Sequence, residues 1–178
     1  NKKLMGWEEI MTENMSKDAI IHAWRGTNEG LSAGGSLIKA AKNGYQTVLS
    51  NGYYIDLMLR VESHYKNDPI SKNSILTPEE KARILGGEAA MWSELATPLN
   101  IDSRIWPRTA AIAERLWSNE NVTDMNSLHK RLKTVSFRLE ELGITHLRNK
   151  EVILRNISNN QETVALNDFS NVCEPLKI

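Results

Sequence analysis

Residues 84–92 read Ile-Leu-Gly-Gly-Glu-Ala-Ala-Met-Trp, a short apolar run between two segments with helical patterns. The run does not alternate between apolar and polar residues, which is typical of a strand that is covered on both faces in a parallel sheet. Three segments of the same kind precede it along the chain, at residues 4–7, 19–24 and 45–50. We therefore expect four buried strands.

Helical patterns separate and follow these strands. They cover residues 28–43, a segment that begins at residue 77, and residues 107–117 and 127–142. At the second of these, the spacing of Thr77 and Glu80 predicts a capping box, and Pro78 stands at the first helical position. Strands that alternate with helices predict βαβ units and an α/β fold with a parallel sheet. Four strands alone leave open sheet edges, so we expect the chain to be part of something larger.

The composition argues against several classes of protein. The 22 basic and 22 acidic residues cancel, and no basic stripe with interleaved aromatics predicts a nucleic-acid partner. No apolar run approaches the ~20 residues that span a bilayer. The histidines show no paired ligand spacing, so we expect no metal and no cofactor, and His22 is expected to be a core histidine with its hydrogen bonds satisfied. Five tryptophans against two phenylalanines indicate a ligand surface, because an indole offers a flat face and an N–H donor.

Large aromatic residues stand at or just after the end of each predicted strand: Trp7, Trp24, Tyr53-Tyr54 and Trp92. Functional groups of parallel α/β folds collect at the carboxyl ends of the strands, so we expect these side chains to share one rim. Asp56 follows Tyr54 by two residues and Glu94 follows Trp92 by two, which in an extended chain places each pair on one side. A flat apolar wall beside a carboxylate suits a sugar ring, whose C–H groups lie on the aromatic face and whose hydroxyls donate to the carboxylate.

The motifs that contain these residues resemble glycoside hydrolase family 20, the family of the β-N-acetylhexosaminidases. They are Gly6-Trp7-Glu8-Glu9, Ala23-Trp24-Arg25 and the segments 50–56, 86–94 and 104–117, in the order of the family, over roughly residues 4–145. The resemblance implies a partial (β/α)8 barrel made of strands five to eight with their helices, followed by a C-terminal helix and tail. Residues 1–148 would be the second half of the catalytic barrel, and residues 149–178 a linker or the start of a further module. Both ends of the sequence are expected to be internal positions of a longer chain.

The resemblance also implies roles for individual residues. Trp7, Trp24 and Trp92 would form the walls of a pocket around a terminal N-acetylhexosamine. The Tyr54 hydroxyl would hold the acetamido oxygen during catalysis, and Asp56 and Glu94 would bind the outer hydroxyls of the sugar. In the segment 104–117, the residues Trp106, Arg108, Glu114, Arg115 and Trp117 would supply packing and internal salt bridges.

The family hydrolyses glycosides by a substrate-assisted, retaining route in which the acetamido oxygen attacks the anomeric carbon. An Asp-Glu pair at the end of the fourth barrel strand supplies the acid and steadies the acetamido nitrogen. The chain contains no Asp-Glu dipeptide, and Glu8-Glu9 belongs to a motif of the fifth strand. We therefore expect a fragment of a β-N-acetylhexosaminidase that is inactive alone.

Two other functions are consistent with parts of the sequence. A non-catalytic carbohydrate-binding module would use the same aromatics, and a helical interaction protein could be built on residues 107–142, although it would leave the aromatics at the strand ends unused. As partners we expect a glycan with a terminal N-acetylhexosamine, and either a second copy of the chain or the missing half-barrel. For the parent enzyme the resemblance implies a secreted, periplasmic or lysosomal location.

Overall fold

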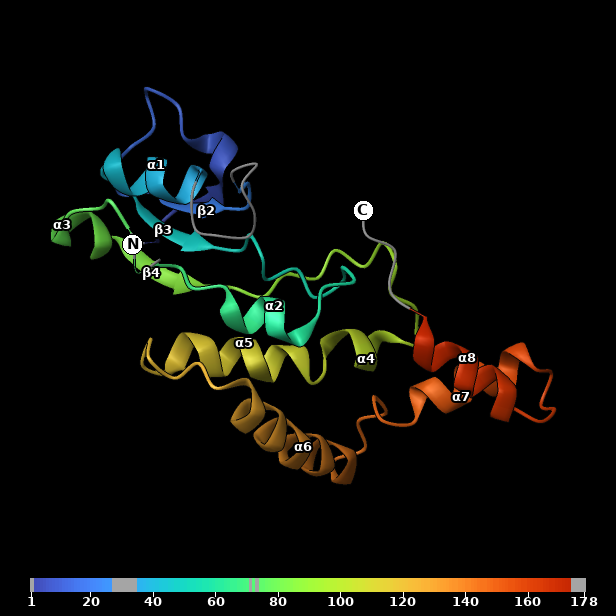
Figure 1. Ribbon diagram of the computed structural model, residues 1–178. Coiled ribbons are helices and arrows are strands. Elements are labelled where there is room, and N and C mark those ends of the chain that lie inside the picture. The colour runs from blue at the N-terminus through green and yellow to red at the C-terminus, as the bar shows by residue number, and fades with distance from the viewer. Residues whose placement is uncertain (1, 27–34, 71, 73, 174–178) are drawn as a thin grey trace.

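The computed structural model describes residues 2–26, 35–70, 72 and 74–173 and contains one parallel sheet (Figure 1). Its four strands are β1 (Met5–Trp7), β2 (Ile20–Ala23), β3 (Gln46–Leu49) and β4 (Ile84–Gly87), and they lie side by side in chain order. Every neighbouring pair is parallel, with Trp7 opposite His22 and His22 opposite Val48. The predicted α/β fold with a parallel sheet is thereby confirmed.

The connections between the strands differ in length. A single 3-10 turn, η1 (Glu8–Ile10), and a short loop lead from β1 to β2, because 12 intervening residues leave no room for a full crossover helix. Helix α1 (Ser36–Lys42) joins β2 to β3, and α2 (Val61–Lys66) and α3 (Pro78–Lys81) lie between β3 and β4. The predicted capping box at α3 is confirmed, since the Thr77 side chain accepts from the Glu80 N–H and the Glu80 carboxylate accepts from the Thr77 N–H.

The strand predicted at residues 84–92 is wrong beyond Gly87. Strand β3 ends at Leu49 and the chain then turns at Gly52, which has φ of +80°, so β4 has no continuous neighbour further along. Only an isolated bridge between Tyr54 and Ala90 continues the pairing. This irregular stretch carries Trp92 away from the sheet and onto the rim beyond it.

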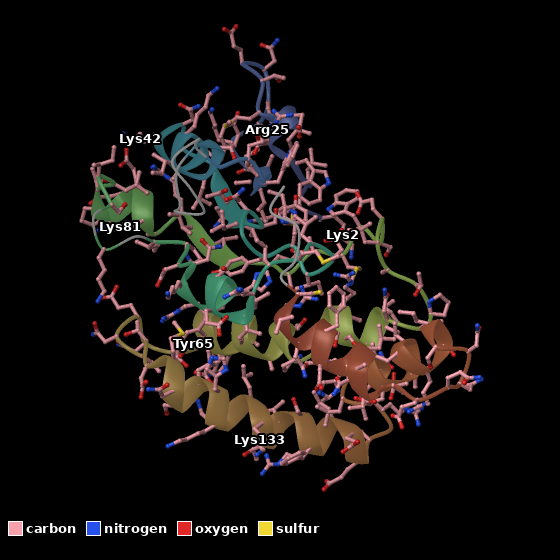
Figure 2. The ribbon with its side chains drawn as sticks, turned by 45° about the vertical axis from the view of Figure 1, so that its right-hand side comes forward. Lys2, Arg25, Lys42, Tyr65, Lys81 and Lys133 are labelled. Atoms are coloured by element: carbon pink, nitrogen blue, oxygen red, sulfur yellow. The ribbon has the colours of Figure 1, made fainter. Side chains whose placement is uncertain are left out.

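Helices cover the sheet on both sides in Figure 1. Helix α1 packs on β2 and β3 around Ile21, Ala40 and Tyr45, whereas α5 (Arg108–Trp117) packs under β4 through Ile112. Beyond α5 lies α6 (Met125–Glu141), and Tyr65 of α2 is buried with Leu128 and Leu132 between them (Figure 2).

The remaining helices are α4 (Ile101–Ile105), α7 (Asn149–Ile157) and α8 (Val164–Val172). The sequence patterns did not predict α2, α4, α7 or α8. The last two occupy much of the segment expected to be a linker or a further module, and Asn149 of α7 donates to Ser103 of α4 at 3.0 Å. Whether this segment is a domain of its own stays a prediction. Among the described residues, no helical segment combines the length and the hydropathy that a bilayer span requires.

The structure also bears on the helix predicted at residues 28–43 and on the roles implied for the segment 104–117. The helix predicted at residues 28–43 is present from Ser36, and residues 28–34 lie outside the described residues. The packing role implied for Trp117 is wrong for the described chain, because its side chain is 94% exposed at the end of α5. The salt-bridge role is confirmed for Glu114, which pairs with Arg131, and for Arg115, which lies 3.9 Å from Asp68.

Candidate functional site

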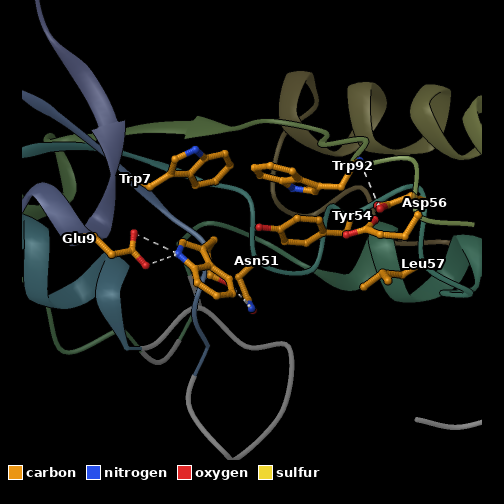
Figure 3. A pocket seen from close by; sticks show the side chains of 9 residues that line it. Trp7, Glu9, Asn51, Tyr54, Asp56, Leu57 and Trp92 are labelled. Atoms are coloured by element: carbon orange, nitrogen blue, oxygen red, sulfur yellow. Dashed lines mark hydrogen bonds between the residues drawn. The ribbon is translucent and has the colours of Figure 1, made fainter.

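A pocket of about 630 Å³ lies at the carboxyl ends of the four strands (Figure 3). The four predicted aromatics all line it, and so do both predicted carboxylates: Trp7, Trp24, Tyr54, Trp92, Asp56 and Glu94. Glu9, Asn51 and Leu57 complete the lining. The predicted convergence at one rim is therefore confirmed as geometry. The substrate-binding roles of these residues stay predictions.

Trp7 is the last residue of β1 and forms one wall of the pocket. Its indole stacks on the imidazole of His22 on the neighbouring strand, with ring centroids 4.1 Å apart and planes 11° from parallel. It also contacts the Trp92 indole, at 5.4 Å between centroids and 42° between planes. Trp92 is 53% exposed, so a large aromatic face is open to a ligand.

His22 itself differs from the expectation of a satisfied core histidine. Its side chain is buried, but its Nε2 atom has no hydrogen-bond partner among the described residues. Burial lowers the pKa of the His22 imidazole, and the nearby Glu88 carboxylate opposes this only in part. His22 therefore stays neutral at neutral pH and supports Trp7 as an uncharged ring.

Trp24, directly after β2, is held by residues that sequence reasoning did not assign to the site. The Glu8 carboxylate accepts from its backbone N–H at 3.1 Å, and the Asn51 side-chain amide donates to its carbonyl at 2.9 Å. The Glu9 carboxylate accepts from the indole N–H at 3.1 Å. The adjacent acids Glu8-Glu9 were the available signal, but no periodicity shows that the turn η1 faces the end of β2.

Tyr54 lies in the loop after β3. Hydrogen bonds to His64 of α2 and to Asn67 anchor this loop. The Tyr53 hydroxyl donates to the Asn67 carbonyl at 2.6 Å, and the Asn67 amide donates to the Asn51 carbonyl at 2.8 Å. His64 contacts the Gly52 carbonyl through Nδ1 at 2.7 Å. Burial raises the pKa of the Tyr54 phenol, so its hydroxyl keeps its proton at neutral pH and can donate a hydrogen bond into the pocket.

Asp56 is almost fully buried at the base of the same pocket. Its Oδ2 atom accepts from the Trp92 backbone N–H at 3.2 Å, and its Oδ1 atom has no partner among the described residues. Buried polar atoms nearly always have a partner, so this oxygen is an exception among the described residues. Arg108 fixes the loop from the far side by donating to the Leu57 carbonyl at 2.7 Å.

Glu94 reaches the pocket by a different backbone path from the one expected. Ser93 has φ of +68°, so the chain between Trp92 and Glu94 is not extended. Glu94 nevertheless lines the pocket and is exposed at its rim. With Glu9 and Asp56 it gives the aromatic pocket three carboxylates, which can accept hydrogen bonds from sugar hydroxyls. No group of three or more His, Cys, Asp or Glu side chains in the described part of the chain could hold a metal ion.

Comparison with known proteins places these residues in a family. Residues 1–120 match the model of the glycosyl hydrolase family 20 catalytic domain. The beta subunit of human β-hexosaminidase is 30% identical over 149 residues, which are 81% of this chain and 26% of that protein. The chain thus spans about a quarter of the length of the curated relatives that it matches.

Solved structures agree in fold. The chitobiase of Flavobacterium johnsoniae is 68% identical with a TM-score of 0.90, and the match covers 99% of this chain and 27% of the chitobiase. An exo-β-N-acetylglucosaminidase of Vibrio harveyi, solved in complex with N-acetylglucosamine, is 25% identical with a TM-score of 0.66 over 79% of this chain and 24% of that enzyme.

Proposed function

The chain belongs to glycosyl hydrolase family 20, and we propose that it supplies the sugar pocket of a β-N-acetylhexosaminidase that removes terminal N-acetylhexosamine from glycans. One observation carries the proposal. Four aromatic and three carboxylate side chains, brought from the ends of all four strands, line a single pocket of about 630 Å³. That volume and lining suit one acetylated amino sugar.

The sheet is proposed to be half of a (β/α)8 barrel, its strands five to eight. Strands β1 and β4 are the two edges of the sheet, and Leu4, Met5 and Leu85 at these edges are 56%, 41% and 51% exposed. An open edge with exposed apolar side chains favours pairing with further strands. The pairing partner would be the missing half-barrel or, for the chain alone, a second copy. A strictly monomeric chain in light scattering would count against self-association.

In the proposed mechanism the pocket presses the acetamido group of the substrate against its own anomeric carbon. Trp7, Trp24 and Trp92 would enclose the sugar ring and the acetyl methyl, and the protonated Tyr54 hydroxyl would donate to the acetamido oxygen. The carboxylates of Asp56 and Glu94, which both line the pocket, would accept from the outer hydroxyls. The first step is intramolecular within the substrate itself, and the pocket would favour it by holding the acetamido oxygen in the geometry of attack.

The acid that protonates the leaving oxygen would come from outside this chain, which has no Asp-Glu pair. The purified chain should therefore release no chromophore from a chromogenic N-acetylglucosaminide. The second candidate, a non-catalytic carbohydrate-binding module, is favoured by the exposed face of Trp92. It predicts millimolar or tighter binding of N-acetylglucosamine by the isolated chain, which titration of tryptophan fluorescence measures. The secreted, periplasmic or lysosomal location remains a prediction for the parent enzyme.

A chimera tests the proposed function directly. In it, this chain replaces the matching quarter of the Flavobacterium johnsoniae chitobiase, a replacement that the TM-score of 0.90 supports. The chimera should hydrolyse the chromogenic N-acetylglucosaminide. In the same chimera, Tyr54→Phe should lower kcat strongly and change KM little. A folded chimera without activity, or one that Tyr54→Phe leaves unchanged, would contradict the proposal.

A further inference from the structure

We propose that Glu9 is a positioning residue that fixes the Trp24 indole as a wall of the pocket and so limits the size of the N-acyl group that the pocket accepts. The inference rests on the proposed function, because it assumes that the pocket holds an N-acylated sugar. It concerns a residue that would act through Trp24. Glu9 is placed by the turn η1, directly after the Trp7 wall.

The backbone of Trp24 is fixed at both of its polar atoms. Glu8 accepts through one oxygen from the N–H groups of Trp24 and Arg25, at 3.1 Å each. On the other side, the Asn51 amide donates to the Trp24 carbonyl at 2.9 Å. The Glu8 side chain is only 8% exposed, so these hydrogen bonds are shielded from water. With the main chain fixed, only the two side-chain torsions of Trp24 remain to be set.

Glu9 is the residue that sets them. Its two carboxylate oxygens lie 3.1 and 3.4 Å from the indole nitrogen of Trp24, as the dashed lines from Glu9 in Figure 3 show. The Arg25 guanidinium pairs with the same carboxylate at 2.8 Å and lies over the Trp24 ring, 4.6 Å from its centroid. The indole is therefore held at its edge by Glu9 and on one face by Arg25.

Trp24 depends on this contact more than the other two walls do. Trp7 is stacked on His22 and contacts Trp92, so those two indoles support each other. In the described part of the chain, no other aromatic ring packs against Trp24. Without the Glu9 carboxylate, the indole N–H loses its hydrogen bond and the ring can rotate away from the sugar, which would enlarge the space beside the acyl group.

The decisive experiment compares Glu9→Ala, Glu9→Gln and a matched control, Glu13→Ala, in the chimera. Glu13 is an exposed acid in the loop beyond η1, so its removal changes the net charge equally without touching the pocket. Glu9→Ala should raise KM for the N-acetyl substrate about tenfold, the effect typical of losing one charge-assisted hydrogen bond, with a smaller change in kcat. It should also raise kcat/KM for an N-butanoyl substrate relative to the N-acetyl substrate. Glu9→Gln should lose less than Glu9→Ala, because the amide oxygen still accepts from the indole N–H although the ion pair with Arg25 is gone.

A second measurement uses the isolated 178-residue chain, where no catalysis is needed. The indole N–H signal of Trp24 in ¹⁵N NMR spectra, assigned with Trp24→Phe, should lose its protection from hydrogen exchange in Glu9→Ala and keep it in Glu9→Gln. The inference is overturned if Glu9→Ala leaves both the exchange and the acyl preference unchanged, or if Glu9→Gln loses as much as Glu9→Ala. An inactive wild-type chimera contradicts the proposed function instead, while the indole signal still decides whether Glu9 holds Trp24.

Discussion

The buried carboxylate of Asp56 accepts a hydrogen bond from the backbone N–H of Trp92 at 3.2 Å and so ties the loop after β3 to the loop after β4. These loops carry Tyr54 and Glu94, which line the same pocket. One oxygen of the carboxylate thus shapes the pocket, and the other has no partner among the described residues. Asp56 is therefore expected to combine a structural and a binding role.

Replacing Asp56 should separate these two roles. Asp56→Asn can still accept from Trp92 through its amide oxygen, whereas Asp56→Ala cannot. In the chimera, Asp56→Ala should lower kcat/KM roughly 10- to 100-fold, the range for a lost hydrogen bond to a charged group, and Asp56→Asn should lower it less. Asp18→Asn, at an exposed acid away from the pocket, is the control. Equal losses in Asp56→Asn and Asp56→Ala would show that only the charge matters.

Much of the fold and the site could be predicted from the sequence because strand ends are local features. The apolar runs that end at Trp7 and Trp24 are confirmed as β1 and β2 with errors of one residue at their ends. Parallel pairing then places both aromatics on one rim, whatever the details of the loops. The same logic located Tyr54 and Trp92, although each lies five residues beyond the end of its strand.

Contacts between loops could not be predicted in this way. Glu9 and Asn51 join the pocket because η1 and the turn at Gly52 reverse the chain direction, which no periodicity encodes. The prediction of an extended chain from Trp92 to Glu94 was wrong for the same reason, because the positive φ of Ser93 leaves no signal in the sequence. Helix α2 was missed because its six residues are too few to show an amphipathic repeat.

Gly52 should be intolerant of any side chain. It has φ of +80°, and a Cβ atom there would lie 2.4 Å from the Asn67 amide nitrogen that anchors the loop of Tyr54. Gly44 has a similar φ of +86° with nothing within 4 Å of the added atom. Gly44→Ala should therefore cost only the left-handed strain, about 1–2 kcal/mol. Gly52→Ala should cost roughly 3 kcal/mol or more, because overpacking adds to the strain.

Urea unfolding of both glycine variants measures this difference. The chimera with Gly52→Ala should also lose activity, since displacing Asn67 moves the loop that carries Tyr54. Equal unfolding free energies for Gly44→Ala and Gly52→Ala would mean that the Asn67 side chain gives way, and that the loop is less rigid than its contacts suggest.

The stability of the chain should fall in mild acid. Burial lowers the pKa of His22, His64 and His146 below the ordinary value of 6.5. Between pH 6.5 and the lower pKa of the folded state, each imidazole takes up a proton when the chain unfolds. The free energy of unfolding is therefore largest above pH 6.5 and decreases as the pH falls through the pKa values of the folded state. Urea unfolding at pH 7.5 and 5.5 should show the decrease.

His64→Asn is the variant that tests the origin of this pH dependence. The Asn side chain can replace the Nδ1 contact with the Gly52 carbonyl, which measures 2.7 Å, but it does not titrate. The pH dependence of the unfolding free energy should therefore be smaller in His64→Asn than in the wild type. An unchanged dependence would exclude His64 as a contributor.

Glu114 should stabilise the attachment of α6 through its charge. Its carboxylate accepts from the Tyr65 hydroxyl at 2.6 Å and from Arg131 Nε at 2.8 Å, which joins α2, α5 and α6. Hydrogen bonds from Arg131 lower the pKa of the Glu114 carboxyl below its ordinary value of 4.5, so the contribution of its charge to stability is complete above that pH and is lost as the pH falls.

Because Glu114 and Arg131 are both partly exposed, Glu114→Gln should lower the free energy of unfolding by only about 1–2 kcal/mol at pH 7. Glu120→Gln, an exposed acid just beyond α5, should change the unfolding free energy by less than about 0.5 kcal/mol. The gap between Glu114→Gln and the wild type should narrow near pH 4, and a gap of the same size at both pH values would assign the effect to packing and not to charge.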